Sequence, residues 1–187
     1  MQPNSRDVNK DTNRALFLDR DGVINVQLVG DYVKCIEEFT FREDFLKSIP
    51  FIAQKFQHII VVTNQQGIAK GICTRENVDF VHEYLCKTLD DKGLHIDKVY
   101  VCPHLAGGGC HCRKPETGMA LQAQHDFPFL DLRASVMVGD SASDMVFGRR
   151  CGMGTVFIGK ITPENEQEVL KNSDHIVVSL YDYIKNC

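Results

Sequence analysis

The 187-residue sequence has no apolar run long enough to span a bilayer, and its polar first 13 residues contain no hydrophobic stretch typical of a signal peptide. It also has no excess of positive charge, because 21 Lys and Arg oppose 25 Asp and Glu, for a net charge of -4. We therefore expect neither nucleic acid nor a membrane as a partner. No repeat, low-complexity tract or linker divides the chain. We expect a cytosolic monomer with a flexible leader over residues 1–13 and a single domain over residues 14–187.

Short apolar runs bounded by polar residues or glycine recur along the chain, as is typical of buried parallel strands. They cover residues 15–18, 58–62, 98–101, 135–138, 155–158 and 175–178. Segments with helical spacing lie between several of them, at residues 43–56, 74–92, 118–125, 143–151 and 163–172. This alternation predicts an α/β fold with a Rossmann-like parallel sheet and helices on both faces.

Polar residues come after four of these runs, where ligands bind in open α/β sheets. Two aspartates in a turn are, taken alone, more often solvated loop residues than catalytic groups. Here, however, four polar groups would converge on one edge of the sheet. They are Asp19 and Asp21 after the first run, Thr63 and Asn64 after the second, Lys114 after the third, and Asp140 and Asp144 after the fourth.

The order and residue types of these groups resemble the four motifs of the haloacid-dehalogenase superfamily over roughly residues 15–159. The resemblance implies that Asp19 is a nucleophile that forms an aspartyl-phosphate, and that Asp21 is the general acid and base. It also implies Mg²⁺ as a cofactor, held by the carboxylates of Asp19 and Asp140 and by the main-chain oxygen of Asp21. Mg²⁺ prefers oxygen ligands of this kind. Asp144 is expected just behind the metal ligands.

The same resemblance assigns Lys114, Thr63 and Asn64 to the phosphoryl group or, for the last two, to holding Asp21. For Thr63 a plainer alternative stays open, in which a threonine at a strand end satisfies the local backbone. An aspartate at position 21 is typical of phosphatases, whereas transport ATPases of the superfamily carry threonine there. Only about forty residues separate the first two motifs, too few for a large cap, which favours hydrolysis by water over phosphoryl transfer within the substrate.

A second set of residues has the spacing of a metal site. Cys102, His104, Cys110 and Cys112 flank a Gly107–Gly109 run, and three thiolates with one imidazole suit a closed, structural Zn²⁺ site. His111 is an alternative to His104 as the nitrogen ligand. Because Arg113 and Lys114 follow directly, Zn²⁺ would fix the start of the segment that carries the phosphate-binding lysine.

This loop narrows the resemblance to the branch that contains heptose bisphosphate phosphatases and histidinol-phosphate phosphatases. Residues 19–25 and 63–69 look more like the former, whereas the short spacing from His104 to Cys110 looks more like the latter. Ser141 stands where heptose enzymes often carry a lysine that could contact a second phosphate. Without that charge, Arg113 would have to recognise the second phosphate through the planar, forked set of N–H donors of its guanidinium.

The substrate that this resemblance favours is a small phosphorylated metabolite, a heptose 1,7-bisphosphate that loses its C7 phosphate. The alternative substrates are histidinol phosphate or another small phosphometabolite. An alternative of a different class is a non-catalytic, zinc-stabilised module that only binds phosphometabolites. Two acids facing one phosphate count against that alternative, because binding alone would not require them.

Overall fold

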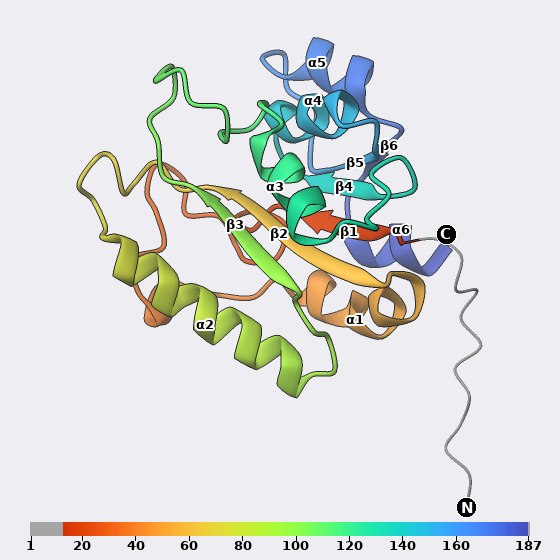
Figure 1. The fold of residues 1–187 in the computed structure, drawn as a ribbon, viewed down its shortest axis with the longest axis horizontal. Helices are drawn as coiled ribbons and strands as arrows, with labels where there is room; N and C mark the ends of the chain where they lie inside the picture. The colour runs from red at the N-terminus through yellow and green to blue at the C-terminus, as the bar shows by residue number, and fades with distance from the viewer. Residues whose placement is uncertain (1–12, 187) are drawn as a thin grey trace, which may run out of the picture.

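The computed structural model describes residues 13–186, in which strands and helices alternate along the chain (Figure 1). All but the last residue of the predicted leader lies outside the described residues. The strands are β1 (Ala15–Leu18), β2 (His58–Asn64), β3 (Lys98–Cys102), β4 (Val136–Gly139), β5 (Gly154–Ile158) and β6 (His175–Val177). The helices are the 3-10 helix η1 (Ile36–Glu38) and α1 (Glu43–Lys55), α2 (Arg75–Asp91), α3 (Gly118–Asp126), α4 (Ala142–Arg150), α5 (Glu166–Asn172) and α6 (Leu180–Asn186).

The strands form one six-stranded sheet in the order β3-β2-β1-β4-β5-β6, and every neighbouring pair is parallel. The chain builds outward from β1 in one direction through β2 and β3, and in the other through β4 to β6. The order therefore reverses between β1 and β4, and in open α/β sheets such a switch point opens a crevice at the carboxyl ends of the strands. The predicted α/β fold with a parallel sheet is confirmed.

Helices cover both faces of the sheet, as Figure 1 shows, with α1, α2 and α6 on one side and α3, α4 and α5 on the other. The central strand β1 is buried from both sides, and its alternate residues face different layers. Leu16 and Leu18 pack with side chains of α1, α2 and α6, whereas Ala15 and Phe17 pack with side chains of α3 and α4. This double burial explains why the strand is a continuous apolar run rather than an alternating one.

The structure differs from the sequence prediction at the C-terminal end. Helix α5 begins at Glu166, because the preceding residues 163–165 form a turn rather than the expected first helical turn. Helix α6 was not predicted. Its seven residues bury only Leu180 and Ile184, and a pattern of two apolar residues is too short to be recognised as a helical period. This helix packs against α1. Within residues 13–186, no helix is both long and apolar enough to cross a membrane.

Candidate active site

The loop after β1 brings Asp19 to the carboxyl edge of the sheet. The amide N–H of Asp19 donates to the carbonyl oxygen of Val138 at 3.0 Å, so pairing with β4 continues up to the aspartate itself. Gly22 then turns the chain with a φ of +88°, and a Cβ at this position would lie 1.8 Å from Oδ2 of Asp140. The loop therefore requires glycine both for its backbone conformation and for the close approach of the Asp140 carboxylate.

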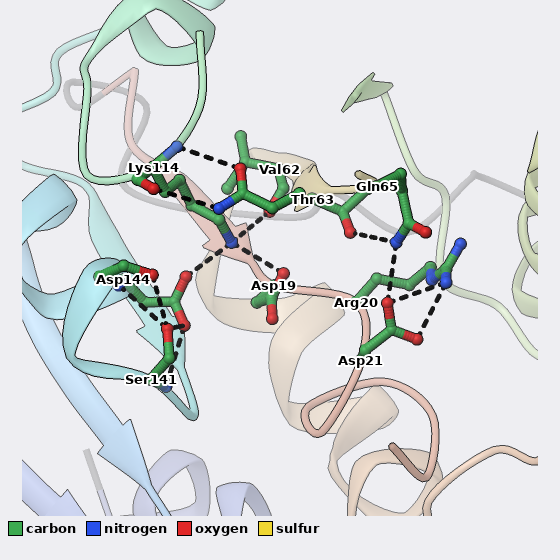
Figure 2. A network of polar contacts seen from close by, with 11 residues as sticks. Asp19, Arg20, Asp21, Val62, Thr63, Gln65, Lys114, Ser141 and Asp144 are labelled. Atoms are coloured by element: carbon green, nitrogen blue, oxygen red, sulfur yellow. Dashed lines mark hydrogen bonds and ion pairs between the residues drawn. The ribbon is translucent and has the colours of Figure 1, made fainter. Parts of the chain in front are cut away.

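Lys114 lies in the middle of the site with its ammonium enclosed (Figure 2). Its Nζ donates to Oδ1 of Asp19 at 2.7 Å and to the carbonyl oxygen of Val62 at 2.7 Å, and it forms an ion pair with Oδ1 of Asp144 at 2.6 Å. Burial lowers the pKa of Lys114, but the two carboxylates outweigh burial and raise it overall, so the side chain stays charged. Two of these contacts are hydrogen bonds and the third is an ion pair, so the ammonium is held between two carboxylates and a main-chain carbonyl.

The side chain of Asn64 holds the main chain of Lys114 through two hydrogen bonds. Its side-chain oxygen accepts from the Lys114 amide at 3.1 Å, and its side-chain nitrogen donates to the Lys114 carbonyl at 3.2 Å. Asn64 also lines the cavity described below, but its amide is already engaged on both sides. The structure thus gives Asn64 a contact that the sequence did not suggest: it fixes the position of the lysine instead of holding Asp21.

Asp144 belongs to the first turn of α4 and supports the site through a capping box. The Ser141 hydroxyl accepts from the Asp144 amide, while the Asp144 carboxylate accepts from the Ser141 amide at 3.0 Å. This exchange satisfies backbone donors that the start of a helix leaves unpaired. It also points the other carboxylate oxygen at Lys114, so one residue both begins the helix and neutralises the lysine.

The carboxylates of Asp19, Asp140 and Asp144 form a cluster, here called the carboxylate centre, whose nearest oxygens all lie within 4.8 Å of one another. Burial raises the pKa of Asp19 to about 7 against the opposing charge of Lys114. Burial and the neighbouring Asp19 and Asp144 raise that of Asp140 to about 8. Like charges held this close disfavour ionisation unless a cation is present.

The donor set fits Mg²⁺. Three carboxylates and one ammonium leave a formal charge of -2 in the buried centre, which one divalent cation would neutralise. All ligand atoms are oxygens, as hard divalent cations prefer. The predicted ligands Asp19 and Asp140 lie in this cluster, and Asp21 is part of the same loop as Asp19.

Asp21 has a different environment, in which its carboxylate accepts hydrogen bonds on both oxygens. Oδ1 accepts from Arg20 at 2.9 Å and from Asn25 at 2.9 Å. Oδ2 accepts from Arg20 at 2.8 Å and from Gln65 at 2.8 Å (Figure 2). Burial raises the pKa of Asp21, but the Arg20 charge and these hydrogen bonds outweigh it, so the pKa lies below its ordinary value. The two aspartates of one loop are thus shifted in opposite directions.

Gln65 is a site residue that sequence reasoning missed. Its side-chain nitrogen donates both to Asp21 and to the hydroxyl oxygen of Thr63, at 2.8 Å each, and its side chain is fully buried. The predicted residue Thr63 is therefore linked to Asp21 through Gln65 rather than directly. A glutamine directly after the Thr63-Asn64 pair was the available signal, because a polar residue there also lies at the carboxyl edge of the sheet.

A cavity of about 400 Å³ opens above these groups. One wall comes from the loop after β1, another from the turn after β2, and a third from the start of α4. All eight residues predicted for phosphoryl transfer line it: Asp19, Asp21, Thr63, Asn64, Arg113, Lys114, Asp140 and Asp144. Sequence reasoning did not assign the further lining residues Gln27, Leu28, Gly30, Asp31, Tyr32, Val33, Gln66, Lys70, Ser141 and Ser143 to the site.

The predicted cysteine and histidine ligands also meet. In the Cys–His loop (residues 102–112), the ligand atoms of Cys102, His104, Cys110 and Cys112 lie within 4.8 Å of one another. The Nδ1 of His104 is 3.2 Å from the Cys112 sulfur, and the Cys102 sulfur is 3.2 Å from that of Cys112. This arrangement is compatible with tetrahedral Zn²⁺. Among the described residues, the cluster contains His104 and not the alternative His111.

The Cys–His loop also contacts the cavity wall. The Arg113 guanidinium donates to the carbonyl oxygen of His104 at 3.5 Å, and the amide of Ala106 donates to the side-chain oxygen of Gln66 at 3.3 Å. Both Arg113 and Gln66 line the cavity. A change in the loop can therefore reach the site through two contacts.

A six-stranded parallel sheet with an aspartate after the central strand and a buried lysine beside it is the arrangement of haloacid-dehalogenase-like hydrolases. A family model described as HAD-hydrolase-like matches residues 111–183. A crystal structure of D,D-heptose 1,7-bisphosphate phosphatase from B. bronchiseptica, complexed with magnesium and phosphate, superposes with a TM-score of 0.79. It is 25% identical, and the match covers 92% of this chain and 97% of that one.

Curated relatives give the narrower assignment. The D-glycero-alpha-D-manno-heptose-1,7-bisphosphate 7-phosphatase of Campylobacter jejuni is 39% identical over 145 residues, which cover 78% of this chain and 81% of the relative. The D-glycero-beta-D-manno-heptose-1,7-bisphosphate 7-phosphatase of Yersinia pestis is 37% identical over 182 residues, which cover 91% and 93%. The chain belongs to the family of D-glycero-D-manno-heptose-1,7-bisphosphate 7-phosphatases.

Proposed function

We propose that the protein is a magnesium-dependent phosphatase that removes the C7 phosphate of D-glycero-D-manno-heptose 1,7-bisphosphate through an aspartyl-phosphate. The observation that carries this proposal is the buried Lys114 held between Asp19 and Asp144 on the floor of an open cavity. A lysine so placed orients the Asp19 carboxylate and supplies positive charge where a phosphoryl dianion would arrive.

The chemistry would proceed in two steps. A carboxylate oxygen of Asp19 forms a bond to phosphorus while the bond from phosphorus to the sugar oxygen breaks, and Asp21 gives that oxygen its proton. Water then attacks the aspartyl-phosphate, Asp21 takes a proton from the water, and inorganic phosphate leaves with Asp19 restored. Dividing the displacement in this way replaces one difficult step by two easier ones.

Mg²⁺ held by Asp19, Asp140 and the main-chain oxygen of Asp21 would screen the repulsion between the incoming phosphate and the carboxylates. The charge of -2 in the carboxylate centre supports this assignment. Asp144 would contribute from behind, since its carboxylate is already bonded to Lys114 and Ser141.

The substrate assignment rests on the relatives and on two cations at the rim. Lys114 is engaged within the carboxylate centre, which leaves Arg113 and Lys70 as the cations of the cavity wall that could meet a second phosphate. Lys70 is exposed, and its ammonium donates to the hydroxyl oxygen of Tyr32 at 3.1 Å. One phosphate of a bisphosphate would lie at the carboxylate centre, and the other would meet these two cations. The relatives include enzymes for both C1 configurations, so our proposal covers the heptose bisphosphate without choosing between the two anomers.

We further propose that the Cys–His loop binds one structural Zn²⁺. Three sulfurs and one imidazole nitrogen select a soft, tetrahedral metal over Mg²⁺. The loop contains three consecutive glycines and has little apolar surface of its own, so that metal binding would offset the entropy lost when it becomes ordered.

The test is phosphate release from D-glycero-D-manno-heptose 1,7-bisphosphate with and without Mg²⁺, followed by ³¹P NMR of the product. We expect Mg²⁺-dependent turnover and a product that retains the C1 phosphate. Histidinol phosphate and mannose 6-phosphate serve as comparison substrates. A higher kcat/KM on histidinol phosphate would replace our substrate assignment, and binding without phosphate release from any ester would indicate the non-catalytic module.

A further inference from the structure

Arg20 lies between the two catalytic aspartates in sequence, yet its side chain is fully buried and does not line the cavity. One guanidinium nitrogen, Nη2, donates to both oxygens of Asp21, as Figure 2 shows. The other, Nη1, lies 3.1 Å from Nε2 of His82. The guanidinium therefore joins the Asp21 carboxylate to a histidine that is 62 residues away in the sequence.

His82 comes from α2, and the helix fixes its direction. Its buried face consists of Val78, Val81, His82, Leu85 and Leu89, so the imidazole points into the protein among apolar neighbours. His82 itself is 6% exposed and does not line the cavity described above. The helix is anchored at its start by a capping box between Thr74 and Asn77. The imidazole is thus a rigid group outside the site.

The chemistry of the contact defines the state of the imidazole. A guanidinium has donors only, so Nε2 of His82 must accept and the ring proton must be on Nδ1. Burial, followed by the Arg20 charge, lowers the pKa of His82 to about 3, which agrees with a neutral ring. A neutral acceptor of this kind orients the guanidinium without competing with Asp21 for its charge.

Arg20 in turn determines where the Asp21 carboxyl group lies. Asn25 contacts only Oδ1 of Asp21, and Gln65 contacts only Oδ2, whereas Arg20 contacts both oxygens. If the guanidinium rotated about its long side chain, both oxygens would lose a donor together. His82 is the described contact that opposes such a rotation from the far end of the guanidinium.

We infer that His82 is a positioning residue for proton transfer, which acts through Arg20 to hold the Asp21 carboxyl where it can reach the oxygen of the leaving alcohol. This inference rests on the proposed function. As the bond from Asp19 to phosphorus forms and the bond to the sugar oxygen breaks, Asp21 must place its proton on that oxygen. A carboxyl displaced by about an ångström can lower the rate of such a step a hundredfold.

The leaving group distinguishes a positioning role from ordinary core packing. The primary alkoxide of a sugar phosphate is a poor leaving group and depends on proton donation, whereas p-nitrophenolate leaves without a proton. Because kcat/KM reports the steps up to cleavage of the ester, it isolates the first proton transfer. Loss of positioning should therefore lower kcat/KM for the sugar phosphate far more than for p-nitrophenyl phosphate.

The experiment compares His82→Leu, which removes the acceptor, with His82→Gln, which offers a side-chain oxygen in its place. We expect His82→Leu to lower kcat/KM on heptose 1,7-bisphosphate at least about tenfold more than kcat/KM on p-nitrophenyl phosphate. In His82→Gln, the ratio of these two kcat/KM values should return most of the way to that of the parent. Val81→Ala is the matched control, because it disturbs the neighbouring buried position without touching Arg20. It should lower Tm and leave the ratio of the two substrates unchanged.

Equal losses on both substrates in His82→Leu, or no loss on either, would overturn the inference. Should His82→Leu fail to fold, Arg20→Lys provides the second variant, because a single ammonium cannot span both Asp21 oxygens and His82. A parental substrate ratio in Arg20→Lys would equally overturn it. If the parent protein released phosphate from neither ester, the proposed function itself would fail, and the inference with it.

Discussion

The carboxylate centre lies in the cavity and the Cys–His loop contacts residues of its wall, but the protein builds them in opposite ways. The carboxylates follow β1 and β4, two strands at the centre of the sheet, and are held by Lys114, Ser141 and the backbone. Cys102 ends the edge strand β3, and the other ligands lie on the following loop with its consecutive glycines. The three sulfurs lie near one another and pack at the border of the hydrophobic core. On our proposal, the fold would order the first site and Mg²⁺ would serve its chemistry, whereas the order of the second site would depend on Zn²⁺.

The largest effect should follow from Asp19→Asn. An amide is a poor nucleophile and a weaker Mg²⁺ ligand of the same size, so we expect kcat to fall by at least about a thousandfold while the fold persists. Steady-state kinetics and thermal unfolding, with the exposed Asp91→Asn as control, would measure both. Activity within a few-fold of the parent would exclude Asp19 as the nucleophile.

Removal of each metal tests the contrast between the two sites directly. Gel filtration into Mg²⁺-free buffer should lower kcat at least about a hundredfold and move Tm by less than about 2 °C, with full recovery when Mg²⁺ returns. Stripping Zn²⁺ with 1,10-phenanthroline should instead lower Tm by more than about 5 °C. Elemental analysis of the untreated protein should find one Zn²⁺ per chain. An unchanged Tm after both treatments would contradict the expected difference between the two sites.

A smaller effect is expected from Cys110→Ser or Cys112→Ser, which remove one thiolate each. Freeing the chain before Arg113 and Lys114 should lower Tm and reduce kcat/KM on the heptose bisphosphate about a hundredfold, with a smaller loss on p-nitrophenyl phosphate. The control is Cys35→Ser, at an exposed cysteine outside the cluster. A variant that loses Zn²⁺ yet keeps parental kcat/KM on both substrates would show that the loop does not support the cavity.

The smallest effect concerns the pH dependence of stability that arises from His82, the buried histidine that contacts Arg20 behind Asp21. Burial and the charges of Arg20 and Arg75 lower the pKa of His82 from 6.5 to about 3, although Asp21 opposes them. Between these values the unfolded chain binds the extra proton, so the free energy of unfolding rises with pH, by at most about 1.4 kcal/mol per pH unit. This contribution is complete above pH 6.5 and is lost as the pH falls toward 3.

Urea unfolding at pH 7, 6 and 5 would measure this dependence. The parent should lose more stability on acidification than His82→Gln, which has no titrating group at this position. Parallel curves for the two proteins would show that His82 does not remain neutral in the folded state.

The sequence was sufficient for the sheet and for the floor of the site. The apolar run at residues 15–18 is typical of a doubly buried strand, and a polar residue that directly follows such a strand lies at the carboxyl edge of the sheet. This argument applies to Asp19 and Asp140, which directly follow such runs, whereas Lys114 lies well after its strand and was assigned from the resemblance to the superfamily motifs. The structure places all three in one cavity.

The supports of these residues could not be predicted in the same way. Arg20 and His82 meet only because α2 packs over the loop after β1, and a helical period identifies a buried face without naming the partner of each side chain. Gln65 reaches Asp21 across the gap between two loops, a contact that depends on side-chain rotamers. The wall formed by residues 27–33 has no periodic pattern, so its place beside the catalytic groups was not visible in the sequence.

The close approach of Gly22 to Asp140 has an evolutionary consequence that becomes clear beside Gly30, a glycine of the cavity wall. Both have positive φ, but a Cβ at Gly22 would collide with the Asp140 carboxylate, whereas a Cβ at Gly30 would meet nothing within 4 Å. Asparagine tolerates the left-handed conformation better than most residues, so lineages could exchange Gly30 for asparagine at modest cost. No L-amino acid with a side chain fits at Gly22 unless the Asp140 side chain moves away. We therefore expect glycine to be retained at position 22, whereas substitutions at position 30 can change the shape of the cavity entrance.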